Sequence, residues 1–207
     1  MKMKTALTIA GSDSSGGAGI QADLKTMTAN GVYAMSAITA LTAQNTTGLQ
    51  GIFEVSPEFL KLQIDSVFTD IRPDAVKIGM LSSPECMKAV ADKLRQYRPA
   101  NVVIDPVMFA KNGDPLMDPK SVGALIETVL PFADVLTPNV PEAQYLAGME
   151  IHTPADMETA ARRIGALGCK NVLVKGGKNI PGAVDVLFDG ETCHRIEIEQ
   201  IDSTSTH

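Results

Sequence analysis

The chain has 207 residues, a length that fits one domain with a substantial core. Its composition, with 44% hydrophobic and 20% charged residues, is that of an ordinary soluble globular protein. The formal net charge of -6 makes the surface repel a phosphate backbone, and no stretch approaches the roughly 20 apolar residues of a membrane span. We therefore expect neither nucleic acid nor a membrane as a partner.

The cysteines, the histidines and the amino terminus bear on the compartment. The cysteines are odd in number and form no C-x-x-C pair, which favours free thiols in a reducing environment. The histidines lack ligand-like spacing with cysteines or acidic residues, so we expect no zinc site. The apolar stretch after Lys4 is shorter than the roughly 7–15 residues of a signal-peptide core. These features predict a cytoplasmic protein.

The predicted elements alternate between strands and helices from the amino terminus onward. Apolar runs at residues 7–10 and 35–41 predict the first two strands. Ser56, Pro57 and Glu58 then combine an N-cap, a proline at the first helical position and an acid in the first turn. The helix that they start carries apolar residues at a helical period, at Leu60, Ile64, Val67, Phe68 and Ile71.

The same helix-start pattern recurs later in the chain. Ser83-Pro84-Glu85 precedes an apolar stripe at Met87, Val90, Ala91 and Leu94. Asp118-Pro119 and Thr153-Pro154 predict two further helices. The last of these has its apolar face at Met157, Ala160, Ala161, Ile164 and Leu167, and Gly168 stands where a C-terminal cap belongs.

Short apolar segments without alternation lie between these helices, at residues 75–78, 102–104, 135–136 and 172–174. Strands that are buried on both faces have this pattern, which predicts an α/β fold with a parallel sheet and helices on each side. Residues 183–188 and 194–198, parted by Asp189-Gly190-Glu191, instead predict an antiparallel hairpin. There is no internal repeat and no linker, so we expect residues 1–207 to form a single domain.

Polar and glycine-rich residues follow the predicted strands, at the end where open α/β sheets bind ligands. They are a glycine loop at residues 11–19, Gln44 and Asn45, Gly79 and Met80, Asp105 to Val107, Thr137 to Asn139 with Glu142, and Lys175 to Gly177. Because the carboxyl ends of parallel strands meet at one edge, this distribution predicts a single site there.

The glycine loop matches two nucleotide-binding patterns only in part. Residues 17–22 fit G-x-G-x-x-A, but no acid stands between Asp23 and Glu54 to hold a ribose, which argues against a dinucleotide site. Gly17 occupies the position of the essential lysine of a P-loop. Two interpretations remain open: a tight strand-to-helix turn, or a loop whose backbone amides approach a small ligand closely.

Five side chains are candidates for the chemistry, and each has a simpler structural explanation. Asp23 is either a ligand or a surface acid of the following helix, and Gln44 either binds the edge of a heterocyclic ring or satisfies a loop. Asp105 and Glu142 are suited to bind a hydrated Mg²⁺. Alternatively, Asp105 starts a turn and Glu142 lies in the first turn of a helix. Lys175 ends an apolar strand just before two glycines, where a phosphate contact is favoured over a solvated ammonium.

Six motifs, taken together, resemble the hydroxymethylpyrimidine and phosphomethylpyrimidine kinases of the ribokinase-like superfamily. They occur in one order along the chain, which makes the resemblance specific, at residues 10–23, 40–46, 77–81, 105–108, 137–143 and 175–177. The resemblance implies a ribokinase-like three-layer sandwich with a mostly parallel central sheet and helices on both faces. It also implies ATP with Mg²⁺ as cofactors, a small-molecule pyrimidine substrate and a homodimer.

The resemblance also assigns roles to individual residues. It implies that Gly11, Asp23 and Gln44 bind the polar groups of the pyrimidine, that Met80 and Val107 flank the ring, that Asp105 and Glu142 position magnesium, and that Asn139 and Lys175 face the nucleotide phosphates. In this family the segment at 203–207 leads into a glycine-rich loop that carries the catalytic residue. We therefore expect the catalytic residue beyond His207, and little kinase activity from a polypeptide that ends there.

The expected function is ATP-dependent phosphorylation of 4-amino-5-hydroxymethyl-2-methylpyrimidine and its monophosphate in thiamine biosynthesis. A pyridoxal kinase of the same fold is the nearest alternative, since pyridoxal is a similar flat heterocycle with a hydroxymethyl group. A pyrimidine-binding protein without catalysis is an alternative of another class. A kinase assay with competing acceptors separates the first pair, and a comparison of binding with turnover tests the last.

Overall fold

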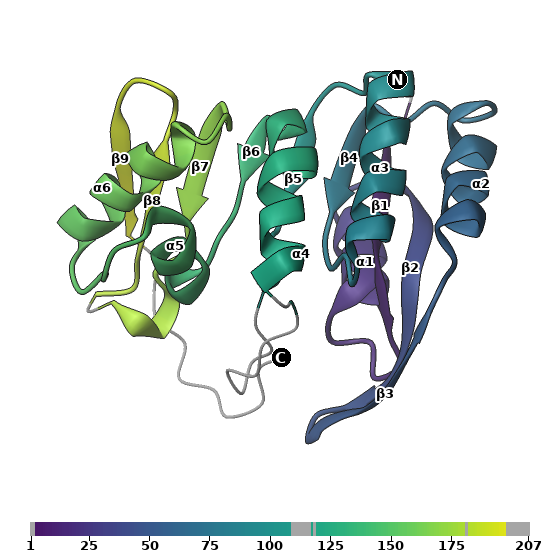
Figure 1. Ribbon diagram of the computed structural model, residues 1–207, viewed down its shortest axis with the longest axis horizontal. Helices are drawn as coiled ribbons and strands as arrows, with labels where there is room; N and C mark the ends of the chain where they lie inside the picture. The colour runs from purple at the N-terminus through teal and green to yellow at the C-terminus, as the bar shows by residue number, and fades with distance from the viewer. Residues whose placement is uncertain (1–2, 109–116, 118, 181, 198–207) are drawn as a thin grey trace.

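A nine-stranded sheet forms the centre of the molecule (Figure 1). The structure is a computed structural model that describes residues 3–108, 117, 119–180 and 182–197. Its strands are β1 (Thr5–Asp13), β2 (Tyr33–Asn45), β3 (Gly48–Glu54), β4 (Ala75–Ile78), β5 (Val102–Ile104), β6 (Val135–Leu136), β7 (Asn171–Val174), β8 (Val184–Phe188) and β9 (Cys193–Glu197). Their spatial order is β3-β2-β1-β4-β5-β6-β7-β8-β9, so the direction in which strands are added reverses at β1.

The six strands from β2 to β7 in this order run parallel, as the sequence predicted. The observed bounds of β4, β5 and β6 coincide with the predicted segments. β8 and β9 form the antiparallel hairpin expected near the carboxyl end, although the predicted residue Ile198 lies outside the described residues. The carboxyl ends of the parallel strands thus meet at one edge of the sheet.

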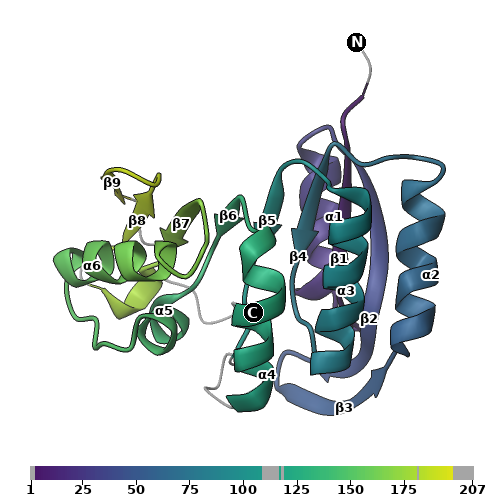
Figure 2. The same cartoon turned by 45° about the horizontal axis from the view of Figure 1, so that its top comes forward.

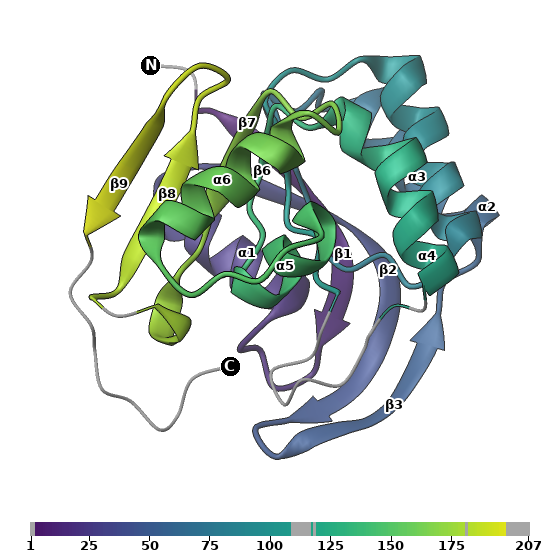
Figure 3. The same cartoon turned by 60° about the vertical axis from the view of Figure 1, so that its left-hand side comes forward.

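Helices cover both faces of the sheet, which confirms the predicted α/β class. They are α1 (Gly19–Ala29), α2 (Pro57–Phe68), α3 (Pro84–Tyr97), α4 (Pro119–Ala124), α5 (Val140–Ala147) and α6 (Pro154–Gly165), and a π-helical stretch at Leu125–Val129 continues α4. α2, α3 and α4 lie side by side on one face, and α1 lies on the opposite face (Figures 2 and 3). One apolar core joins helices α2–α6 to the sheet, whereas α1, on the opposite face, buries Ile20 outside that core.

The predicted helix starts are confirmed by their capping hydrogen bonds. The Ser56 side chain accepts from the Phe59 amide at the start of α2, and Ser83 caps α3 in the same way. Thr153 forms a capping box with Asp156 at the start of α6. At the remaining predicted start, Asp118-Pro119, α4 begins at Pro119, and Asp118 lies outside the described residues. These caps satisfy amides that have no partner within the helix.

Two predicted buried faces extend too far. α2 ends at Phe68, so Ile71 is exposed although the same-face residue Ile64 is buried. α6 ends at Gly165 with Ala166 as its C-cap, which leaves Leu167 exposed. In both places the apolar periodicity continues past the point where the backbone leaves the helix.

The second strand and its partner also differ from the prediction. β2 extends to Asn45, so Gln44 lies within a strand and does not follow one. β3 pairs antiparallel with β2 and was not predicted at all. All seven residues of β3 are exposed, so no buried face imposes the alternation by which strands are recognised in sequence.

Strands β4 to β7 are fully buried on one face only, whereas β1 is buried on both faces over residues 6–11. In β4, Val76 and Ile78 are buried, whereas Lys77 is half-buried on the face that carries α1. Val103 in β5 and Leu173 in β7 are likewise half-buried. Burial on both faces was therefore an overestimate for the segments at 75–78, 102–104, 135–136 and 172–174, for which it was predicted. Within the same residues, no helix is both long and apolar enough to cross a membrane.

Candidate active site

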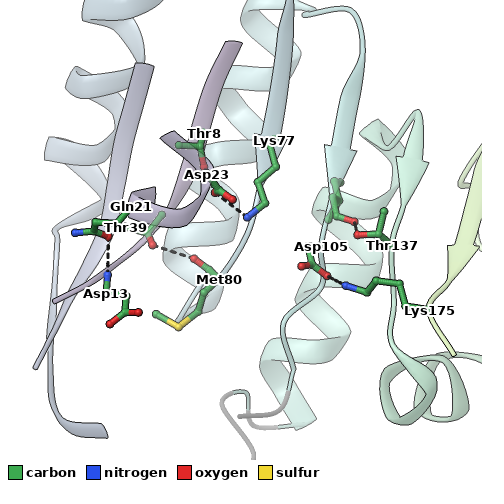
Figure 4. A network of polar contacts seen from close by, with 11 residues as sticks. Thr8, Asp13, Gln21, Asp23, Thr39, Lys77, Met80, Asp105, Thr137 and Lys175 are labelled. Atoms are coloured by element: carbon green, nitrogen blue, oxygen red, sulfur yellow. Dashed lines mark hydrogen bonds and ion pairs between the residues drawn. The ribbon is translucent and has the colours of Figure 1, made fainter. Parts of the chain in front are cut away.

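The candidate residues gather in two groups at the carboxyl edge of the sheet (Figure 4). One group surrounds Asp23 and Met80, near the ends of β1 and β4, and the other joins Asp105 to Lys175 at the ends of β5 and β7. The reversal of strand order at β1 falls within the first group, which is where open α/β sheets bind ligands. The predicted convergence of these residues on one edge is therefore observed.

The glycine loop after β1 is organised by Asp13, a residue that is only 3% exposed. Its carboxylate accepts hydrogen bonds from the backbone amides of Ser15 at 2.9 Å, Gly17 at 2.9 Å and Ala18 at 2.8 Å. Burial by itself raises the pKa of Asp13, but these bonds, with one from the Ser15 hydroxyl, bring that pKa below its ordinary value. No role for Asp13 was predictable from the sequence, because such a cluster of amides depends on the path of the loop.

The loop is also fixed against β1 by Gln21 and Gly19. Gln21 accepts from the Asp13 amide at 2.8 Å and donates to the Ser12 hydroxyl at 2.8 Å. Gly19 has a φ of +56°, and a Cβ there would lie 2.3 Å from the Gly11 carbonyl oxygen. Local packing thus accounts for the glycine at this position, as the tight-turn interpretation proposed.

Met80 and Gly11 define one wall of the first group. A Cβ on Gly11 would lie 2.9 Å from the terminal methyl carbon of Met80, so the glycine lets the thioether approach the β1 backbone. The Thr39 hydroxyl donates to the Met80 carbonyl at 2.9 Å and fixes the backbone there. These contacts hold the polarizable Met80 side chain against the β1 backbone at Gly11.

Gln44 is held beside the glycine loop through its backbone. Its amide donates to the Ser14 hydroxyl at 2.9 Å, and that hydroxyl donates to the Gln44 carbonyl at 2.6 Å. Within the described part of the chain, the side-chain amide of Gln44 makes no hydrogen bond. The alternative in which this side chain satisfies the local backbone is therefore wrong for these residues.

Asp23 forms a three-residue network with Thr8 and Lys77. Its Oδ2 accepts from the Thr8 hydroxyl at 2.6 Å and from the Lys77 ammonium at 2.8 Å. The side chains of Asp23 and Lys77 are 17% and 23% exposed. Asp23 is thus no solvated surface acid, and Lys77, which the sequence analysis named only within a motif, is its charge partner.

The second group centres on an ion pair between Lys175 and Asp105. The Lys175 ammonium lies 3.0 Å from Oδ1 of Asp105, and both side chains are half-buried. The Lys175 amide donates to the Pro138 carbonyl at 2.8 Å, which brings the backbones of Asn139 and Lys175 together as a parallel bridge. The lysine therefore has an anionic partner within the protein at the position where a phosphate contact was predicted.

Glu142 is 2% exposed, and both of its carboxylate oxygens accept backbone amides. Oε2 accepts from Asn139 at 2.9 Å, and the Asn139 side chain in turn accepts from the Glu142 amide, which completes the capping box of α5. Oε1 accepts from Met108 at 3.0 Å. Burial raises the pKa of Glu142, and the hydrogen bonds from Asn139 and Met108 oppose this shift only in part. The first-turn role considered for Glu142 is therefore observed.

The Met108 contact stabilises an unusual backbone at the preceding residue. Val107 has a φ of +41°, a left-handed conformation that β-branched residues rarely adopt. Such a conformation costs on the order of 1–3 kcal/mol and persists where its surroundings impose it, often at functional sites. Glu142 thus ties the turn after β5 to the start of α5.

The two carboxylates are also the candidate metal ligands. The charge of Asp105 contributes to raising the pKa of Glu142, so the two groups interact. The described residues contain no group of three or more His, Cys, Asp or Glu side chains that would hold a metal ion. An all-oxygen pair of this kind fits an ion that keeps several of its waters, as Mg²⁺ does.

The comparisons with known proteins identify the family. The family profile described as phosphomethylpyrimidine kinase matches residues 13–207. The chain belongs to the phosphomethylpyrimidine kinase family. It is 47% identical over 209 residues to a hydroxymethylpyrimidine/phosphomethylpyrimidine kinase of Escherichia coli, covering 100% of this chain and 79% of the relative. It is 53% identical over 202 residues to a thiamine biosynthesis bifunctional protein of Geobacter sulfurreducens, but spans only 41% of that longer protein and 97% of itself.

Solved structures agree with this membership of the phosphomethylpyrimidine kinase family. A phosphomethylpyrimidine kinase from Clostridium difficile has a TM-score of 0.89 at 47% identity, covering 95% of this chain and 85% of the other. An ADP complex of a Bacillus subtilis pyridoxal kinase has a TM-score of 0.90 at 42% identity, covering 100% and 78%. The ribokinase-like fold and the class of phosphotransferase are thereby confirmed, and membership of a kinase family implies ATP as the phosphoryl donor.

Family membership leaves the individual roles of the site residues as predictions. The segment at 203–207, where the resemblance predicted an approach to the catalytic loop, lies outside the described residues. Asp13, Thr8 and Lys77 are the side chains that sequence reasoning missed. A charged residue within an otherwise apolar central strand was the available signal for Lys77.

Proposed function

We propose that the protein containing this chain transfers a phosphoryl group from ATP to 4-amino-5-hydroxymethyl-2-methylpyrimidine, and then to its monophosphate, in thiamine biosynthesis. The observation that carries the proposal is the match of residues 13–207 to the phosphomethylpyrimidine kinase family. Phosphoryl transfer asks a protein mainly for positioning and for stabilisation of charge. The two groups of residues at the sheet edge fit these two tasks.

The group around Met80 is the proposed acceptor pocket. Gly11, Asp23 and Gln44 would bind the polar groups of the pyrimidine, with Met80 and Val107 on either side of the ring. The side-chain amide of Gln44 has no hydrogen-bond partner among the described residues, so its carbonyl and NH₂ groups remain for a ligand. The Thr39 contact and the Asp13-centred loop supply the rigidity that a positioned acceptor needs.

The group around Lys175 is the proposed phosphate site. Lys175 and Asn139 would face the nucleotide phosphates, with Asp105 and Glu142 beside a hydrated Mg²⁺. When bound, this ion would neutralise negative charge on the phosphates. The Lys175–Asp105 pair keeps the ammonium compensated before nucleotide binds, and the Glu142 bonds to Asn139 and Met108 hold the turn beside it. Glu142 thus acts first as a positioning residue.

Pyridoxal phosphorylation is the second candidate activity, because a specific observation favours it. Two pyridoxal kinases of known structure have a TM-score of 0.90 with this chain, at 42% identity for the Bacillus subtilis protein and 34% for that of Staphylococcus aureus. The two acceptors differ next to the reacting hydroxymethyl group, where the pyrimidine carries an amino group and pyridoxal an aldehyde. This difference provides a direct test.

The experiment is a competition assay on the complete gene product. ADP release is measured with the aminopyrimidine alone, with pyridoxal alone and with both. We expect a higher kcat/KM for the pyrimidine and a suppressed yield of phosphorylated pyridoxal in the mixture. A reversed preference would assign pyridoxal as the substrate. Pyrimidine binding by calorimetry without any turnover would support the non-catalytic binding protein.

We also propose a homodimer in the cytoplasm. Support for a partner surface comes from the outer strands, where apolar side chains lie exposed at Leu41, Leu49, Ile52 and Phe53, the last with 70% of its surface accessible. Exposed apolar patches of this kind commonly mark interaction sites. Light scattering on the wild type and on Phe53→Ser tests the dimer, and a wild-type monomer at micromolar concentration would contradict it.

A further inference from the structure

The Thr8–Lys77–Asp23 network has a geometry that the proposed acceptor pocket does not by itself require. Lys77 in β4 and Thr8 in β1 are register partners in neighbouring central strands. Both donate to the same carboxylate oxygen, Oδ2 of Asp23, which comes from α1. Two strands and a helix thus converge on one atom.

The Lys77 side chain reaches from β4 toward Asp23 (Figure 4). A Cβ on Gly79 would lie 2.9 Å from the Lys77 nitrogen, so the glycine leaves room for the ammonium. Met80, the proposed wall of the acceptor pocket, is the next residue. The Lys77 ammonium therefore lies at the carboxyl end of β4, next to the proposed acceptor site.

The other oxygen of the Asp23 carboxylate is differently placed. Within the described part of the chain, Oδ1 has no hydrogen-bond partner, whereas Oδ2 has two. In those residues every buried side-chain oxygen or nitrogen has a hydrogen-bond partner. Because Oδ1 has none, it is accessible to solvent. The network fixes one oxygen of Asp23 and leaves the second for a ligand.

Stability alone is a weak explanation for this arrangement. A half-buried ion pair loses much of its attraction to desolvation, and apolar side chains of similar volume are often as stabilising. A comparable pair, Lys93 with Asp65 at 2.7 Å, joins α3 to α2 away from the sheet edge. It provides a matched reference for a purely structural role.

We propose that Lys77 and Thr8 are positioning residues that fix Asp23 as a hydrogen-bond acceptor for a ring amino group and so select an aminopyrimidine over a ring aldehyde. The inference rests on the proposed function. A carboxylate oxygen accepts hydrogen bonds and donates none. It therefore accepts a hydrogen bond from an amino group, but it forms none with an aldehyde oxygen, because both atoms are acceptors. A site built for a donor discriminates strongly against a ligand that lacks it.

The test compares two ligands across four forms of the complete protein. Calorimetry gives the affinities of the wild type, Lys77→Met, Lys77→Arg and Thr8→Val for 4-amino-5-hydroxymethyl-2-methylpyrimidine and for pyridoxal. We expect Lys77→Met to weaken pyrimidine binding about ten- to a hundredfold, the weight of one charge-assisted hydrogen bond, and pyridoxal binding much less. The KM for the pyrimidine should rise accordingly while the KM for ATP stays unchanged. Lys77→Arg should restore part of the preference.

Two further variants keep the result interpretable. Thr8→Val preserves the shape of a buried side chain, so it tests the network even if Lys77→Met fails to fold, and it should shift the ligand ratio in the same direction. Lys93→Met removes the reference ion pair and should lower the thermal midpoint without changing the ratio. Equal losses for both ligands in Lys77→Met and Thr8→Val, or a change in thermal midpoint only, would overturn the inference. A wild type that binds neither ring, or prefers pyridoxal, would overturn the proposed function as well.

Discussion

Asp13→Asn should destabilise the protein in a way that depends on pH. In the wild type, three backbone amides and the Ser15 hydroxyl donate to this nearly buried carboxylate. Hydrogen bonds to a charged group contribute about 1.5–3 kcal/mol each when buried. Ser15 and Gly17 are exposed and their amides can return to water, and asparagine keeps one acceptor oxygen. We therefore expect a loss of about 2 kcal/mol in the free energy of unfolding near neutral pH.

The sign of the pH dependence follows from the pKa of Asp13, which is below its ordinary value of 3.8 in the folded chain. A carboxyl group with a lowered folded pKa contributes stability above its unfolded pKa, and that contribution is lost as the pH falls through the folded value. Urea unfolding of the wild type and Asp13→Asn should thus differ at neutral pH and converge in acid. Asp70→Asn, at an exposed residue, is the control. An equal difference at both pH values would refute the role given to the Asp13 charge.

Three other substitutions, the first with Gly31→Ala as its control, test the loop and the two groups of the site. Gly19→Ala should cost about 2 kcal/mol or more in urea unfolding, because its Cβ meets the Gly11 carbonyl at 2.3 Å. Gly31→Ala, at a positive φ with nothing within 4 Å, should cost only about 1 kcal/mol, and equal losses would show that the close approach is unimportant. Gln44→Ala should weaken pyrimidine binding by about 1–3 kcal/mol with unchanged thermal stability. An unchanged affinity in calorimetry would show that the proposed location of the acceptor pocket is wrong. Lys175→Ala in the complete gene product should lower turnover at saturating ATP by roughly 10²–10³ and weaken acceptor binding less. Normal turnover would remove Lys175 from the phosphate site.

The elements that were predicted well from the sequence are those whose burial or capping requires particular residue types. β4, β5 and β6 match their predicted bounds because they are short runs, apolar except for Lys77, between polar segments. The helix starts at Ser56 and Ser83 were recognisable because capping depends on neighbouring residues only. β3 escaped detection because an edge strand with every residue exposed has no buried face to pattern.

The site was predictable in its location but not in its internal contacts. Residues after parallel strands must meet at one sheet edge, so the grouping of Asp105 with Lys175 followed from topology. The amide cluster around Asp13 and the pairing of Lys77 with Asp23 depend on how a loop and a helix pack against β1. No spacing along the chain encodes such contacts, whose partners in the second case are 54 residues apart.

The proposed reaction is phosphorylation of a pyrimidine alcohol and then of the resulting monophosphate. The most direct measurement is a time course, by mass spectrometry, of the complete gene product with ATP, Mg²⁺ and 4-amino-5-hydroxymethyl-2-methylpyrimidine. We predict that the monophosphate appears first and is then converted to the diphosphate, with one ADP released for each phosphoryl group transferred. A pyrimidine that remains unmodified while pyridoxal is phosphorylated under the same conditions would contradict this account.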